Sequence, residues 1–141
     1  HWLHLAFEGT ATPTFAALKM ETQAELEKYP LQPNAINLHG YVLESAAAWN
    51  TPGAELETAK LLERAMGQTT GGHCWLRMQL AIAWWRVGNK REALRNYSKV
   101  VEDDPRWSLP ATSPISPAPR VLPPEMIDLF NQMQPAPTPP P

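Results

Sequence analysis

The chain has 141 residues, a formal net charge of −2, 43% hydrophobic residues and 18% charged residues, a composition typical of a globular domain. A domain of this size buries roughly 68% of the surface that its unfolded chain exposes, so it can form a core without disulfides or metals. The balanced charge argues against a strongly basic nucleic-acid-binding protein and against an acidic disordered tail. We therefore expect no nucleic-acid partner.

Cysteine content and apolar segments exclude further classes of protein. The single cysteine, Cys74, rules out an internal disulfide, a multi-cysteine zinc site and a covalently attached c-type haem. The longest apolar stretches, residues 2–7 and 80–85, fall far short of the ~20 residues that cross a bilayer, so we expect no membrane span. The sequence starts at His1 rather than at Met, so we expect a missing upstream segment and leave the cellular compartment open.

The domain over residues 1–107 is predicted to be all-α, because apolar positions recur at helical spacing and no long alternating β-branched run occurs. The six predicted helices cover residues 3–8, 12–29, 34–50, 51–67, 73–87 and 89–104. Gly67 is expected to close the fourth helix as its C′ residue, and Gly88 to end the fifth. Asn89 and Glu92 predict an N-cap and a capping box for the sixth.

The predicted helices form a repeating pair, because the start signals Thr12, Thr51 and Asn89 are 39 and 38 residues apart. The last pair carries large, small and turn-forming residues at fixed spacings: Leu80, Ala81, Trp84, Gly88, Ala93, Tyr97, Asp104 and Pro105. With this pattern residues 74–107 resemble a tetratricopeptide repeat (TPR), while residues 1–66 resemble it only in degenerate form. The resemblance implies a right-handed solenoid of about three helix pairs.

Two residues of the last pair depart from the TPR pattern. Arg77 stands where a large apolar residue is usual, and Val100 stands where a small residue is usual. These departures do not remove the basis for packing. Two helices approach closely where small side chains face large ones, and stacked pairs bury the faces that a lone pair leaves open.

A partner-binding groove is predicted on the fifth helix. The TPR resemblance implies that this side lines the concave face of the solenoid, away from the seam of Leu80 and Trp84. The groove residues are Trp75, Met78, Ile82, Trp85 and Arg86. Aromatic and methionine anchors suit a partner's helix or extended segment. The alternative is that the tail or the preceding helix pair simply covers this face.

Proline marks the tail, since twelve of the 16 prolines lie in residues 105–141. We predict that residues 108–141 form a proline-rich tail, with 109–124 running extended and 135–141 polyproline-like, because proline fixes φ and lacks a backbone donor.

One short helix is predicted within the tail, over residues 124–134, with Pro124 at its first position. Its apolar side chains share one face: Met126, Ile127, Phe130 and Met133. Two roles stay open for this helix. It caps the last helix pair, which we favour, or it is displayed to another protein.

A basic stripe is formed by Arg91, Arg95 and Lys99 at spacings of four residues. A solvated helix face is the simpler interpretation, and an acidic partner or an anionic membrane surface is the alternative. We expect no catalytic site, metal or cofactor, because neither His73 with Cys74 nor the pair His1 and His4 has the companions that such chemistry needs.

Two functions remain open on the sequence alone. The first is a non-enzymatic interaction module, a TPR-type adaptor or scaffold that binds a protein partner's peptide or helix in the groove. The second is a structural or assembly subunit of a larger complex, with its apolar faces and tail packed on neighbouring subunits. Peripheral association with a membrane complex is compatible with either function.

Overall fold

The structure is a computed structural model that describes residues 15–69, 74–122 and 124–134. Over these residues the chain is all-α, with seven α-helices, one 3-10 helix (η1) and no strand. The elements are α2 (Phe15–Lys28), α3 (Pro33–Trp49), α4 (Glu55–Gly67), α5 (Cys74–Val87), α6 (Lys90–Asp103), η1 (Pro105–Ser108), α7 (Ala118–Val121) and α8 (Pro124–Met133). The helix predicted over residues 3–8 lies outside the described residues.

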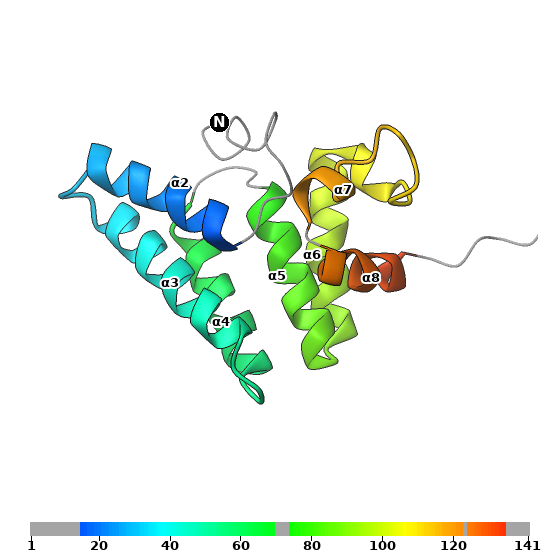
Figure 1. The fold of residues 1–141 in the computed structure, drawn as a ribbon, viewed down its shortest axis with the longest axis horizontal. Helices are drawn as coiled ribbons and strands as arrows, with labels where there is room; N and C mark the ends of the chain where they lie inside the picture. Colours follow the sequence, from blue (N-terminus) through cyan, green and yellow to red (C-terminus); the bar gives the residue numbers. More distant parts are fainter. Residues whose placement is uncertain (1–14, 70–73, 123, 135–141) are drawn as a thin grey trace, which may run out of the picture.

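Each helix from α2 to α6 packs against the next one in the chain. Figure 1 shows α2, α3 and α4 on one side of the molecule, and α5 and α6 with the tail helices α7 and α8 on the other. Neighbours run antiparallel: the start of α2 meets the end of α3 through Phe15 and Trp49, and Asn37 near the start of α3 donates to Gln68 just after α4. The tail thus returns to the last helix pair.

The turn between α5 and α6 forms as the sequence predicts. Gly88 has φ of 97°, a left-handed conformation that glycine adopts without a steric penalty. Asn89 then caps α6, because its side-chain oxygen accepts a hydrogen bond from the Glu92 N–H at 3.2 Å. The reciprocal half of a capping box does not form, since the Asn89 N–H bonds to the Trp84 carbonyl and the Glu92 carboxylate pairs with Arg95.

Both ends of α4 differ from the prediction. Gly67 is the last residue of the helix and is not in the left-handed region, so it is not a C′ glycine. The helix tightens instead, with the Gln68 N–H bonded to the Ala65 carbonyl at 3.1 Å. The left-handed glycine lies before α4, where Gly53 at φ of 83° forms the turn from α3. Thr51 therefore belongs to this turn, and the helix begins only at Glu55.

The tail also differs from the predicted extended path. Residues 118–121 form the short helix α7, in which the Val121 N–H bonds to the Pro117 carbonyl at 3.0 Å. The prolines of this segment stand at or before the first helical turn, where the missing N–H has no intrahelical partner to lose. The prediction failed because it treated proline only as a helix breaker.

One contiguous core runs from α2 to the tail. The residues at the TPR positions of the last pair are buried: Leu80, Ala81, Trp84, Ala93, Tyr97 and Val100. Ala93 is fully buried on α6, which packs along the length of α5. A small residue at this point allows the two helices to approach closely.

We predict that Ala93→Leu lowers the free energy of unfolding by ~1 to 3 kcal/mol, because extra carbons overpack the α5–α6 interface. Denaturant titration measures the change. The matched control on the exposed side of the same helix, Arg91→Ala, should alter stability by less than about 0.5 kcal/mol. Equal effects of the two substitutions would contradict the tight interface at Ala93.

Candidate functional site

The predicted groove face of α5 lies beneath the chain's own tail. Trp75, Met78 and Ile82 are buried, while Trp85 and Arg86 are half-buried. The element that packs on this helix from the tail is α8, which Figure 1 shows beside α5. In the described residues the face is therefore an occupied surface rather than an open groove.

Two tryptophan side chains bond the tail to the two ends of this face. The Trp75 indole N–H donates to the Val121 carbonyl at the end of α7 at 3.0 Å. About three turns further along α5, the Trp85 indole N–H donates to Oε1 of Gln132 on α8 at 3.3 Å. Each indole thus combines apolar contact with one directed hydrogen bond, a usual arrangement for tryptophan at an interface.

The tail helix buries one apolar face. Met126, Phe130 and Met133 are 2%, 0% and 3% exposed, and Ile127 is half-buried. Hence the four apolar positions predicted for this helix turn away from solvent wholly or in part, and the polar side of α8 faces outward. Such a one-sided helix is suited to lie in a groove.

Phe130 anchors α8 on an aromatic pair. Its ring centroid lies 6.1 Å from that of Tyr97 on α6 and 6.0 Å from that of Trp107 in η1, and both contacts are edge-to-face. Aromatic pairs of this geometry stabilise an interface by ~0.5 to 1.5 kcal/mol beyond the area that they bury. The repeat pattern predicts the place of Tyr97 in the helix pair, but it gives no sign that Trp107 forms the second wall of the Phe130 site.

The rim of the Phe130 site is held by backbone carbonyls. Nε2 of Gln134 donates to the Leu109 carbonyl at 2.9 Å and to the Ser108 carbonyl at 3.4 Å. The Tyr97 hydroxyl donates to the Trp107 carbonyl. Burial raises the pKa of Tyr97, which keeps this hydroxyl a donor. No sequence pattern identifies these carbonyls, because their position depends on how η1 folds back.

Arg86 serves a different contact from the predicted one. Its guanidinium lies 4.3 Å from the centre of the Trp49 ring and donates to the Trp49 carbonyl at 3.0 Å. Phe15 packs on the same indole with ring centroids 5.6 Å apart. Arg86 therefore links α5 to the end of α3.

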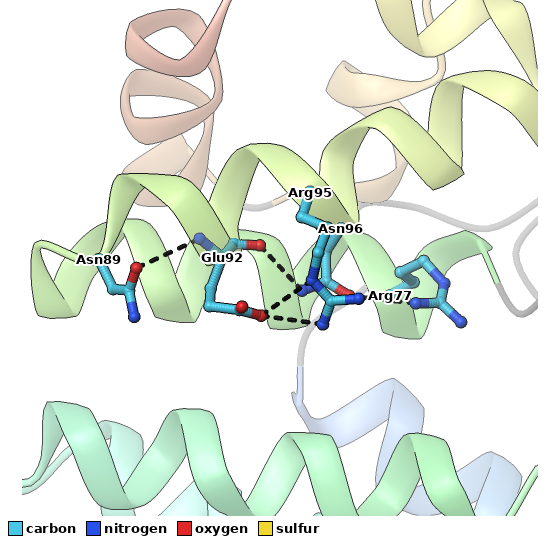
Figure 2. A network of polar contacts seen from close by, with 5 residues as sticks. All are labelled: Arg77, Asn89, Glu92, Arg95 and Asn96. Atoms are coloured by element: carbon cyan, nitrogen blue, oxygen red, sulfur yellow. Dashed lines mark hydrogen bonds and ion pairs between the residues drawn. The ribbon is translucent and has the colours of Figure 1, made fainter.

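The basic stripe on α6 is exposed, and Figure 2 shows the polar network that holds its central member. Arg95 pairs with the Glu92 carboxylate at 2.9 Å, and this hydrogen bond raises the Arg95 pKa. An exposed pair of this kind contributes little to stability. Arg91 and Lys99, the outer members, are exposed to solvent.

Asn96 is the hydrogen-bond partner of Arg77, a residue that departs from the predicted repeat pattern. The Arg77 guanidinium donates to Asn96 Oδ1 at 3.1 Å, and Asn96 Nδ2 donates to the Glu92 carbonyl at 2.9 Å, as drawn in Figure 2. The buried amide of Asn96 thus satisfies a charged side chain where the TPR pattern has a large apolar residue.

Two buried side chains of α5 hold polar atoms with no hydrogen-bond partner among the described residues. They are both amide atoms of Gln79 and the indole nitrogen of Trp84. Gln79 lies one helical turn after Trp75 and about one turn before Ile82, on the same side of α5. A buried group without a partner costs ~1 to 3 kcal/mol, so Gln79 lowers the stability of this face.

We predict that Gln79→Met raises the free energy of unfolding by ~1 kcal/mol, because methionine keeps the length of the side chain and removes the unsatisfied amide. The control is Gln23→Met on the exposed side of α2, which should change stability by less than about 0.5 kcal/mol. A loss of stability in Gln79→Met would show that the amide has a partner after all.

Cys74 is half-buried at the start of α5. Burial, and then the nearby carboxylates of Asp103 and Asp104, raise its pKa. A raised pKa keeps the thiol protonated, and the protonated form is the unreactive one. His73, His1 and His4 lie outside the described residues.

We predict that Cys74 reacts with iodoacetamide at pH 7.5 more slowly in the folded chain than in the same chain in urea. The rate should keep rising with pH beyond the range of an ordinary thiol, because the folded thiol ionises later. A folded chain that reacts faster than the unfolded chain would contradict the protective environment.

Clusters of potential metal ligands and membrane-spanning helices are both absent from the part of the chain that the structure describes. Residues 15–69, 74–122 and 124–134 hold no cluster of three or more His, Cys, Asp or Glu side chains placed to bind a metal. Over the same residues no helix is long and apolar enough to cross a membrane.

Exposed apolar side chains also occur along α2, α3 and their connection. They are Met20, Tyr29, Leu31, Ile36 and Leu43, of which Leu31 and Met20 are 91% and 73% exposed. We call this set the α2–α3 surface. Its helices also carry exposed or half-exposed carboxylates, among them Glu21 and Glu44.

Comparison of the chain with protein-family models, curated proteins and solved structures found no match. The candidate site is therefore defined by its own contacts. It consists of the α5 face between Trp75 and Trp85, the aromatic pair of Tyr97 and Trp107, and the helix α8 that lies there.

Proposed function

We propose that the chain is a non-enzymatic protein-interaction module of the TPR type, an adaptor or scaffold whose α5 face is a groove for an amphipathic helix. The observation that carries the proposal is the near-complete burial of Met126, Phe130 and Met133 when α8 lies there. A surface that holds one short amphipathic helix in cis has the shape and chemistry to hold a similar helix of a partner.

Several features support the TPR-like arrangement. Antiparallel neighbours pack in chain order, the small and large residues of the last pair are buried against each other, and Gly88 makes the left-handed turn between them. In such a solenoid each pair contacts only its neighbours, so the last pair leaves an apolar face that a cap or a partner must cover.

Tethering determines when a partner can bind. A helix held on a short linker has an effective concentration on the order of millimolar, so a partner at micromolar concentration must bind ~1,000-fold more tightly than α8 or meet a weakened tail. The resident helix therefore sets a threshold that a weak, non-specific helix does not reach.

The second candidate function, a structural subunit of a larger complex, is favoured by the α2–α3 surface. Five exposed apolar side chains on two neighbouring helices and their connection are candidates for a contact surface. If this function holds, the double substitution Leu31→Ser and Leu43→Ser should abolish self-association or complex formation. The α8 substitutions Phe130→Ala and Met126→Ala should leave both unchanged.

Binding of a peptide in trans tests the groove. Phe130→Ala in the full chain removes the anchor of α8, and Met126→Ala is a milder second variant. We predict that a fluorescent peptide of residues 122–134 binds both variants at least ten-fold more tightly than the wild-type chain, because the groove is vacated. Fluorescence anisotropy measures the binding.

The control is Asp128→Asn on the exposed side of α8, which should bind the peptide no better than the wild-type chain does. Circular dichroism checks that the helices of each variant remain folded. Absence of peptide binding to both folded groove variants would contradict the groove and leave α8 as a permanent part of the core.

A further inference from the structure

The proposed groove can select its occupant by polar groups as well as by apolar side chains. At two hydrogen bonds on its rim, the protein group can act only as a donor or only as an acceptor. This inference rests on the proposed function. At one point the Trp85 indole N–H donates to Gln132 Oε1, and at the other the Leu109 carbonyl accepts from Gln134 Nε2. An indole N–H can only donate and a backbone carbonyl can only accept. The rim therefore favours an acceptor at the first position and a donor at the second.

The occupant's spacing follows from α8. Counted from Met126 as position 0, the buried anchors lie at 0, +4 and +7, the acceptor at +6 and the donor at +8. The anchors share one helix face, and the two polar positions flank the last anchor. A partner helix must repeat this order to use every contact of the groove.

The charge near the acceptor position favours an anion over the resident amide. The Lys90 ammonium lies 5.1 Å from the centre of the Trp85 ring, next to the indole that holds Gln132. A carboxylate at +6 would accept the same hydrogen bond and also gain attraction from Lys90. In α8 itself the carboxylate of Asp128 stands at +2, on the exposed side of the helix.

We propose that the groove's partner is an amphipathic helix of another protein, with apolar or aromatic residues at 0, +4 and +7, glutamate at +6 and a side-chain donor at +8. In this arrangement α8 is a resident stand-in that lacks the charge at +6. A partner helix with this pattern keeps every other contact and gains one ion pair, so it needs a three- to ten-fold lower concentration than a copy of α8 to displace the tethered tail.

Peptide variants test the pattern on the full chain carrying Phe130→Ala. The peptide of residues 122–134 with Gln132→Glu should bind three- to ten-fold more tightly than the unmodified peptide at low salt, and Gln132→Lys at least three-fold more weakly. Gln134→Ala should weaken binding two- to ten-fold. The control, Asn131→Ala on the exposed side, should change binding less than two-fold.

The substitution Lys90→Gln in the protein tests whether the Lys90 ammonium causes the tighter binding of the Gln132→Glu peptide. The advantage of the Gln132→Glu peptide should disappear with Lys90→Gln and at 0.5 M salt, while the unmodified peptide binds as before. Equal binding of the unmodified peptide and its three variants at positions 132 and 134 would overturn the pattern and leave the proposed groove standing. Failure of every peptide to bind would overturn the groove and the pattern together.

A second copy of the chain is the competing occupant. Light scattering of the wild-type chain should give a monomer. A dimer that dissociates when the Gln132→Glu peptide is added would show that copies exchange α8, and it would overturn the assignment of the groove to another protein.

Discussion

The packing of Phe130 between Tyr97 and Trp107 holds the C-terminal part of the structure together. These three rings come from α8, α6 and η1, so one buried side chain joins the tail to the last helix pair and to the segment that links them. Without this contact the tail would still have the buried side chains of Leu122, Met126 and Met133 and the hydrogen bonds of Trp75, Trp85 and Gln134, but it would lose its aromatic cluster with α6 and η1.

Under the proposed function, the same contact explains how a groove for a partner helix and a stable core share residues. The end of a helical repeat has an apolar face without a neighbour, and water contact with that face is costly. A tethered helix covers it at low entropic cost, because the entropy lost on closing a linker grows only slowly with its length. Burial of this side of α5 leaves the Gln79 amide without a hydrogen-bond partner among the described residues, so the packing does not satisfy every buried polar group.

Local signals made the α5–α6 pair predictable. Gly88 and Asn89 act through their own backbone and side chain, so their roles could be assigned from the sequence and are found in the structure. The apolar face of α8 was equally readable from its spacing. The conformation of Gly67, the helix α7 and the carbonyl rim at Leu109 were not predictable, because they depend on how distant segments meet. The sequence places Arg86 on the groove side of its helix. Its actual contact with Trp49 spans 37 residues of chain, so no local pattern predicts it.

The proposed function depends most directly on α8 lying on α5 in solution as a resident, displaceable helix. Hydrogen–deuterium exchange of the full chain measures this through the amides of residues 124–134. We predict that these amides exchange more slowly than in the isolated peptide, more quickly than those of α5, and faster still when a competing groove peptide is added. Exchange of α8 at the rate of the isolated peptide would contradict its place on α5, and exchange unchanged by any competing peptide would contradict its displacement.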